Sequence, residues 1–559
     1  MNTKPDKSDA GATRQRDKGF FDEPSIGDVS EKRNVENLQT ERKIGDCHIF
    51  DYQEFKNIKP RLGSEKDADR LEYDFKGLDF NVYRHLNLPK PETINVLVKA
   101  SQKDHSQSKY FICCFLTHGE KGILCMPEGS IYVDDILRCF SHTHPTLYGK
   151  PKIFIFQACR GTNCEEGILE STDAGSIDNS AEFLDFLIVN STYEGTMSFK
   201  TLSLKDETKN HGSYFIDELC RSLENFSHEK DLLQILTIVN YRIATFYVSA
   251  TDDVKTNQKK QMPCVTSRLR TEVKFNKKID LYETVDTCFF DNRRKQHRLG
   301  ALSTLDPSSD YKSYEIPSSE NVNFLSILNT DGDMGNDLNC FASKLWSVIS
   351  EKNYQRIEKK NKKKLDLQSY LLTFAGQEIA NTKCFICFIA GCAKGDSFYD
   401  SQNKKFLKQD LVERFVGKKC PSLVGKPKIF IFLLFPQTKP KKFSLIPCIS
   451  ADSGDLPKST RRNFIPVHAD ILEVTIIVKD SKQLEVTVEK LISILKGGES
   501  GEDLLQSLTK MNNELVPSTE YCTPKVKAGK YSSRRSSLQE ENTISFSFHS
   551  TLTKTVKLP

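Results

Sequence analysis

The string GKPKIFIF occurs twice in this chain, at residues 149–156 and 425–432. The copies lie 276 residues apart (425 − 149), and an identical octapeptide at that distance indicates a duplicated domain. The residues after the two copies differ, because the first copy continues as Gln157-Ala-Cys-Arg-Gly161 and the second as Leu433-Leu-Phe-Pro-Gln437. A chain of 559 residues is also too long for one ordinary core. We therefore expect two domains, with chemistry kept in the first copy and lost in the second.

Charge and hydropathy argue against several classes of partner and against insertion in a membrane. The 80 basic and 75 acidic residues leave a net charge of +5, which argues against nucleic acid or an anionic membrane as partner. No stretch approaches the roughly 18 apolar residues of a membrane span. Many of the 17 cysteines lie in apolar stretches, as Cys113, Cys114, Cys384 and Cys387 do, where a buried thiol acts as a small hydrophobe. We expect a cytoplasmic protein in a reducing environment.

The order of local patterns predicts the architecture. Residues 1–43 are polar and charged and are expected to form a short disordered prodomain. Apolar strands alternate with amphipathic helices after that point, which predicts an α/β fold with a mainly parallel sheet covered on both faces. Strands are expected at 48–50, 111–116, 153–156, 183–189 and 264–275, and helices at 66–78, 133–140, 212–224 and 231–246.

The second half repeats this order with weaker identity. The segment 502–506 parallels 230–234, and 544–558 parallels the last strand of the first half. We expect a first domain at 44–278, a flexible linker at 279–319 and a second domain at 320–559.

Two strand ends carry reactive groups. One apolar strand runs into His118-Gly119, and the first octapeptide runs into Cys159. The carboxyl ends of neighbouring parallel strands meet at one edge of a sheet, where a histidine can activate a thiol. Alone, a cysteine after a strand is most often structural and His-Gly is a common turn. Together they predict a Cys/His dyad.

The string 157–161 with a histidine upstream is a caspase signature. With the strings 117–122 and 260–264, the chain resembles a caspase over residues 46–278. The resemblance implies the caspase-haemoglobinase fold, a three-layer α/β/α arrangement, in each half, with no cofactor and no metal. It also implies that Cys159 attacks the scissile carbonyl and that His118 protonates the leaving amine. The backbone N–H groups of Gly119 and Cys159 would hold the oxyanion, and a Cβ at residue 119 would crowd the substrate.

Caspases cleave after aspartate, using two arginines and a glutamine in the S1 pocket. Arg61 and Gln157 match two of these positions, whereas Lys200 stands where the family has the second arginine. Lysine keeps the charge but loses the planar fork, so we expect aspartate preference with weakened efficiency. The alternative is a misaligned loop in which Lys200 is an ordinary solvated side chain.

The resemblance also predicts activation by cleavage. The segment 165–181 matches the intersubunit linker and contains Asp173 and Asp178 as self-cleavage sites, although a lone aspartate is more often a surface acid. Asp28 could release the leader. The expected products are a large subunit of about 44–173 and a small subunit of about 179–278.

The second copy lacks these groups. Aligning the strand ends puts Gly391-Cys392 where His118-Gly119 stand, and Phe435 where Cys159 stands. We therefore expect a pseudoprotease domain. The resemblance implies pairing through the last strand with another caspase-type domain, either within one chain or in a homo- or heterodimer. Our hypothesis is that the two domains pair within one chain, with the second as a regulatory partner.

Two functions from different classes remain. The first is an aspartate-directed cysteine endopeptidase acting on protein substrates in apoptotic or immune signalling. The second is a non-catalytic regulator or decoy that binds another caspase. The intact His118, Gly119, Gln157 and Cys159 favour the enzyme. Specificity for arginine or lysine, as in metacaspases and paracaspases, is disfavoured because Arg61 and Lys200 would repel a basic side chain.

Overall fold

The computed structural model describes residues 43–120, 122–141, 144–160, 183–201, 212–249, 256–277, 279, 313–330, 335–376, 381–394, 397–436, 468–497, 502–516 and 544–559. Contacts among them join Lys43 to Pro559 in a single unit, so both expected domains belong to it.

The first domain contributes six strands to the main sheet, in the order β2-β1-β3-β7-β8-β11. All neighbours pair in parallel except β8 and β11, which are antiparallel. The strands span Gly45–Asp51 (β1), Phe80–Leu86 (β2), Tyr110–Leu116 (β3), Lys152–Gln157 (β7), Phe186–Asn190 (β8) and Cys264–Ser267 (β11). Short strands lie beside them at Gly119–Glu120 (β4), Ile123–Cys125 (β5), Ser130–Tyr132 (β6), Lys200–Thr201 (β9) and Gly212–Ser213 (β10).

The second domain repeats this order as β13-β12-β14-β17-β18-β19. Again the last strand alone runs antiparallel to its neighbour. The strands span Val322–Leu328 (β12), Gln355–Lys360 (β13), Cys384–Lys394 (β14), Lys428–Pro436 (β17), Ile471–Ile477 (β18) and Ser545–Ser550 (β19), with Ser397–Tyr399 (β15) and Lys405–Leu407 (β16) beside β14.

Alternating side chains of the strands supply two cores. In β3, Phe111, Cys113 and Phe115 face one cluster, which includes residues of α2 and α3. The intervening Ile112 and Cys114 face the opposite cluster, with α1, α4 and α5. Successive strand residues point to opposite faces, so apolar runs such as β3 need helices on both sides. The helices of this domain span Ser64–Gly77 (α1), Lys90–Gln102 (α2), Val133–Arg138 (α3), Tyr214–Phe226 (α4) and Leu232–Phe246 (α5).

The second domain is layered in the same way. Residues of α8 and α9 pack on one face of its sheet, and residues of α7, α10 and α11 pack on the other. These helices span Gly335–Glu351 (α7), Lys364–Gly376 (α8), Lys408–Val412 (α9), Ser481–Leu495 (α10) and Leu504–Leu515 (α11). The predicted three-layer α/β/α fold is confirmed in both halves.

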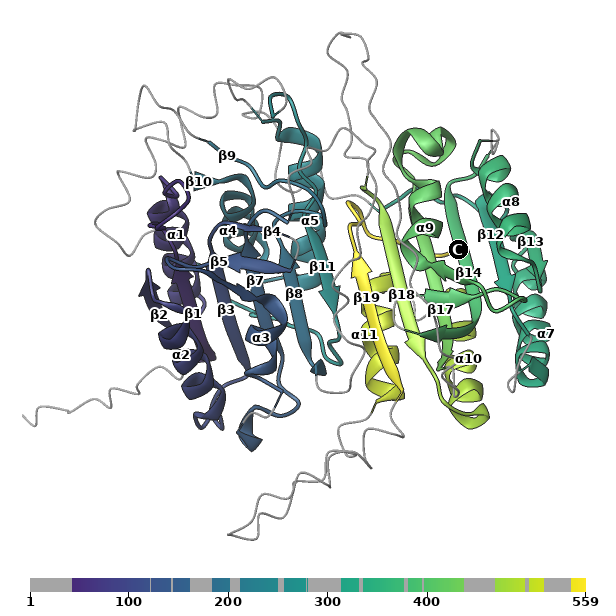
Figure 1. The fold of residues 1–559 in the computed structure, drawn as a ribbon. Coiled ribbons are helices and arrows are strands. Elements are labelled where there is room, and N and C mark those ends of the chain that lie inside the picture. The colour runs from purple at the N-terminus through teal and green to yellow at the C-terminus, as the bar shows by residue number, and fades with distance from the viewer. Residues whose placement is uncertain are drawn as a thin grey trace, which may run out of the picture. The chain divides into compact units, whose positions relative to one another are not determined.

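The last strands of the two domains pair with each other (Figure 1). Antiparallel pairing of β11 with β19 sets Val265 opposite Ser550 and Ser267 opposite Phe548, so one sheet continues through both domains. The helices beside this junction also meet. Gln234 Nε2 donates to Asp503 Oδ2 at 3.3 Å, and Gln506 Nε2 donates to Asp231 Oδ2 at 3.0 Å. The repeated strings 230–234 and 502–506 thus contact each other reciprocally.

One expectation about the strands was wrong, and two elements were not anticipated. The last strand of the first domain ends at Ser267 instead of extending to residue 275. Its partner strand β8 begins at Phe186, whose carbonyl accepts from the Arg268 N–H, so the partner strand ends at this point of the ladder. In addition, β2 and α2 were not anticipated, since β2 is largely exposed and lacks a clear apolar pattern.

Candidate active site

Strand register brings the two predicted catalytic residues to one place. β3 and β7 pair in parallel, with Leu116 opposite Gln157. The Thr117 N–H then donates to the Gln157 carbonyl at 3.1 Å, which continues the alignment past the strand ends. His118 and Cys159 each come two residues after the last paired position. The register of two buried strands therefore places both predicted catalytic residues at the same edge of the sheet.

Gly119 lies against the backbone of the cysteine. A Cβ built on Gly119 would lie 2.9 Å from the Cys159 carbonyl oxygen and 2.8 Å from the Ile123 carbonyl oxygen. Real Cβ atoms do not approach backbone oxygens so closely, so this position requires glycine. We expected a Cβ here to crowd the substrate. The structure shows that it would first meet the protein's own backbone.

The ring and the thiol of the dyad have definite partners. His118 Nε2 lies 3.0 Å from the Lys59 carbonyl oxygen, and its ring lies 5.0 Å from that of Phe55, centroid to centroid. A carbonyl only accepts hydrogen bonds, so Nε2 carries a hydrogen and donates it to the Lys59 carbonyl. The Cys159 Sγ is half-buried and lies 3.8 Å from the Ser198 carbonyl oxygen.

Arg61 is held by a buried polar network. Its Nη1 donates to Ser64 Oγ at 2.5 Å, and Ser64 Oγ in turn donates to Asp51 Oδ1 at 2.5 Å. Its Nη2 lies 3.8 Å from Asp67 Oδ2. Burial lowers the pKa of Arg61, whereas the negative charges of Asp67 and Asp51 act to raise it. The Lys59 carbonyl that His118 contacts lies two residues before Arg61, so the same segment brings Arg61 close to the histidine.

Gln157 retains an unused acceptor. Its side chain is buried, and Nε2 donates to Ser198 Oγ at 2.9 Å. The other side-chain atom, Oε1, has no hydrogen-bond partner among the described residues. An unpaired buried acceptor can only receive a donor. The Nε2 amide nitrogen, however, carries two hydrogens, and the bond to Ser198 Oγ uses one of them, so the second can be donated to a carboxylate.

The position of Lys200 is described for its backbone alone. Lys200 pairs across the β9–β10 ribbon with Ser213. The Ser213 N–H donates to Asp67 Oδ1 at 2.7 Å, and Asp67 is the carboxylate beside Arg61. The ribbon thus brings the Lys200 backbone to the Arg61 network. The predicted processing sites Asp28, Asp173 and Asp178 lie outside the described residues.

A family model for the caspase domain matches residues 44–274 and again residues 335–543. The chain belongs to the caspase family. Caspase-7 from Gallus gallus is 33% identical over 249 residues, which cover 42% of this chain and 78% of the relative. Caspase-3 from Mesocricetus auratus is 34% identical over 242 residues, covering 42% and 84% respectively. The solved structure of Caspase-1 from Spodoptera frugiperda has 32% identity and a TM-score of 0.38, covering 42% of this chain and 91% of that one. Membership of the caspase family supports a proteolytic function of the cysteine-protease kind.

The caspase site in the second domain is replaced by continuous sheet. The octapeptide makes Gln157 and Leu433 equivalent, and Leu433 pairs with Ala390. Two residues further on, Cys392 stands where the first domain has His118, and it pairs with Phe435. The sequence alignment had placed Gly391 there and was wrong by one residue. Apolar strands of similar composition can be aligned in either register, and the ladder decides between them.

Several residues of the site were not anticipated from the sequence. Ser198 contacts both Gln157 and Cys159, and Asp67 links Arg61 to the β10 strand. Gln261 accepts from the Phe199 N–H at 2.7 Å and so anchors the same loop. The sequence offered one signal for Asp51 and Asp67, which is that charged residues stand at the end of β1 and at the start of α1. The structure shows that both carboxylates are almost completely buried.

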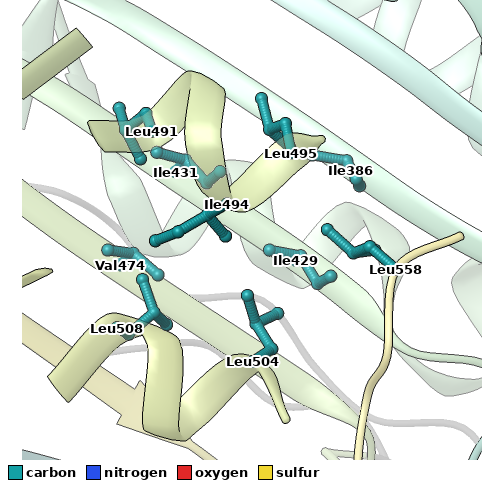
Figure 2. Close-up of a pocket in the computed structure, with 10 residues that line it drawn as sticks. All are labelled: Ile386, Ile429, Ile431, Val474, Leu491, Ile494, Leu495, Leu504, Leu508 and Leu558. Carbon is teal, nitrogen blue, oxygen red and sulfur yellow. The ribbon is translucent and has the colours of Figure 1, made fainter. Parts of the chain in front are cut away.

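Other features of the described residues do not form a site. No group of three or more His, Cys, Asp or Glu side chains in the described ranges is arranged to hold a metal. None of the helices that the structure describes has the length and apolar character needed to cross a bilayer. A cavity in the second domain lies among apolar side chains of the sheet and of α10 and α11 (Figure 2). Its lining has no polar group to orient a ligand. The lining residues are Ile386, Ile429, Ile431, Val474, Leu491, Ile494, Leu495, Leu504, Leu508 and Leu558.

Proposed function

We propose that this chain is a cysteine endopeptidase that cleaves proteins after aspartate. The observation that carries the proposal is the register of β3 and β7, which sets His118 and Cys159 at matching positions beyond paired strand ends. The buried Arg61 nearby supports the aspartate preference, because a substrate carboxylate in a pocket needs a cation and hydrogen-bond donors.

The chemistry follows from the positions of these groups. His118 Nδ1 takes the proton of the Cys159 thiol. The resulting thiolate attacks the carbonyl carbon, and the negative charge moves to the carbonyl oxygen. The backbone N–H groups of Gly119 and Cys159 hold that oxyanion. The leaving amine takes a proton from His118 Nδ1 as the C–N bond breaks, which leaves an acyl-enzyme that water hydrolyses. The intact amide of Gln157 assists Arg61 in binding the aspartate.

The second domain acts in this proposal as the dimerisation partner within the same chain. Its β19 occupies the edge of β11, which would otherwise be open for pairing. We infer that the full chain stays monomeric as its concentration rises, because this edge is covered. Sedimentation equilibrium of the purified chain tests this point, and a mass that doubles with concentration contradicts it.

The biological setting that fits this activity is proteolytic signalling in the cytoplasm, in apoptosis or immunity, with activation by cleavage at Asp173 or Asp178. Mass spectrometry of the purified chain, beside its Cys159→Ala variant, tests the processing. Cleavage after either aspartate in the wild type alone supports self-processing, whereas an unprocessed active chain excludes it as a requirement.

Peptide hydrolysis tests the activity itself. The full chain is assayed on a fluorogenic peptide ending in aspartate and on a matched peptide ending in asparagine, with Cys159→Ala as control. Turnover of the aspartate peptide by the wild type alone supports the proposal. Turnover no higher than that of Cys159→Ala overturns it and favours the non-catalytic regulator, which inhibition or activation of an added caspase would then reveal.

A further inference from the structure

An aromatic side chain next to the active site is held by the second domain. Tyr193 lies in the segment after β8, which leads to Ser198 beside Cys159. Its ring is stacked on the ring of His468, with centroids 4.1 Å apart and planes inclined by 12°. The ring of His549 meets the Tyr193 ring edge-on at 5.9 Å. Both histidines belong to the second domain, so that domain contributes two of the rings around Tyr193.

Each histidine is itself fixed in place. His468 Nε2 lies 3.0 Å from Glu413 Oε1. Burial of Glu413 acts to raise its pKa, but the hydrogen bonds and charges of His468 and Lys419 together lower that pKa. His549 Nδ1 lies 3.0 Å from Thr266 Oγ1, and His549 is the residue opposite Thr266 in the ladder between β11 and β19. Neither ring can turn away from Tyr193 without losing a polar contact.

The Tyr193 backbone is connected to the nucleophile by a short chain of hydrogen bonds. Its carbonyl oxygen accepts from the Thr196 N–H at 3.2 Å and from Thr196 Oγ1 at 2.7 Å. The Thr196 carbonyl accepts from the Arg160 N–H at 3.0 Å, and the Gly195 N–H donates to the Arg160 carbonyl at 3.0 Å. Arg160 is the residue directly after Cys159 in the sequence.

The same segment also sets the substrate pocket. Ser198 Oγ accepts from Gln157 Nε2 at 2.9 Å, and its carbonyl lies 3.8 Å from Cys159 Sγ. A shift of residues 193–198 would therefore move both the nucleophile and the amide that completes the pocket. Misplacement of such groups by an ångström costs much activity.

We propose that His468 and His549 of the second domain are positioning residues for the active site of the first domain, acting through Tyr193. This inference rests on the proposed protease function and specifies how the second domain regulates it. It gives the degenerate copy a defined structural role, because the active-site segment depends on rings that the first domain does not supply.

The test uses the full chain with both histidines replaced, His468→Ala and His549→Ala together. We expect kcat/KM for the aspartate peptide to fall about tenfold, since two aromatic contacts are lost. Hydrogen exchange of the backbone at residues 193–198 should become faster, while that of residues 264–267 in β11 stays slow. Alkylation of Cys159 by iodoacetamide should change in rate and in pH profile. The matched control is His228→Ala, which alters an exposed histidine after α4 and should leave all three readouts unchanged.

A second pair of variants covers the case in which the double variant separates the domains. Tyr193→Phe keeps the ring and should behave as the wild type, whereas Tyr193→Ala should reproduce the loss. Wild-type activity, alkylation and exchange in both Tyr193→Ala and the double histidine variant would overturn the inference. An inactive wild type would overturn the protease proposal alone, because alkylation and exchange still report the position of the segment.

Discussion

The repeated octapeptide has the same environment in β7 and in β17, and the two strands differ only beyond it. In both, the second lysine is buried and its ammonium group donates to a carbonyl two residues earlier, Lys152 to Lys150 at 3.0 Å and Lys428 to Lys426 at 2.9 Å. Burial lowers the pKa of Lys152 to about 8 and also lowers that of Lys428. The shared string is thus explained by packing of the sheet and carries no catalytic group.

The difference begins where the octapeptide ends. In the first domain, pairing of β3 with β7 stops at Leu116 and Gln157, and the chain turns toward Gly119. In the second domain, pairing of β14 with β17 continues to Ala393 opposite Pro436. A catalytic site at a strand end needs backbone that has left the ladder. The degenerate copy has extended its sheet through that place.

The largest effect is expected in the turn after β3, which carries Gly119 and which the second domain replaces with sheet. Gly119→Ala should lower kcat/KM about 100-fold or more, because the new Cβ would lie under 3 Å from two backbone oxygens and displace His118 or Cys159. Peptide hydrolysis measures the effect, and circular dichroism confirms folding. Gly376→Ala in the second domain is the matched control, since a Cβ there meets nothing within 4 Å. Equal activity of both variants would show that the turn does not need close contact.

Exchange of equivalent strand residues gives the next largest effect. Gln157→Leu introduces the residue found at Leu433 and should lower kcat/KM for the aspartate peptide about 30-fold, since the substrate carboxylate loses a hydrogen-bond donor. The reverse change, Leu433→Gln, should destabilise the protein by about 1–3 kcal/mol without altering activity, because it buries an amide with no partner. Chemical denaturation measures the second effect. Undiminished hydrolysis by Gln157→Leu would show that Gln157 does not bind the substrate aspartate.

The junction between the domains should be sensitive at Asn512. Its Nδ2 donates to the carbonyl oxygens of Arg268 at 3.1 Å and Leu269 at 2.9 Å, in a fully buried position. Asn512→Ala should cost about 2 kcal/mol, since it leaves two buried carbonyls without this donor. Thermal unfolding of the full chain measures the loss. Asn336→Ala at the exposed start of α7 is the control, and equal Tm values for the two variants would contradict a tight junction.

The smallest expected effect is a pH dependence of stability. It comes from the reciprocal contact between the first turns of α5 and α11, where Asp231 and Asp503 are the N-caps. Burial raises the pKa of Asp231 to about 6, and the charge of Asp503 adds to this increase. The hydrogen bond from the Gln234 N–H acts in the opposite direction and lowers the pKa. The folded chain therefore binds more protons than the unfolded chain between about pH 4 and 6, so this group's stabilisation is lost as pH rises through that window.

Replacing Asp231 isolates this dependence. From pH 4.5 to 6, the free energy of unfolding of the wild type relative to Asp231→Asn should fall by about 1.5 kcal/mol. Denaturation at about pH 4.5, 5.25 and 6, which spans this window, measures the difference. Parallel profiles for the two proteins would mean that the carboxyl group is not buried at the junction.

Much of the first domain could be predicted because its signals are local. The β3 and β7 strands are continuous apolar runs with a reactive residue at the end of each, and a parallel sheet aligns such ends. The cysteine, the histidine and the glycine after it could therefore be named as candidates, and the string 157–161 with the upstream histidine allowed the family to be recognised. By contrast, β2 is exposed on much of its surface and gave no apolar pattern to detect.

The amino-acid sequence by itself determined the duplication, the fold of each copy, the family and the choice of candidate dyad residues, because these depend on residue type and order within short segments. Tertiary structure alone decided three matters: the one-residue register that puts Cys392 in the place of His118, the network of Asp51 and Asp67 around Arg61, and the stacking of His468 on Tyr193. Each depends on which distant segments pair and at what offset. Hydrogen bonding and packing across the whole sheet select that offset, and a local string cannot record it.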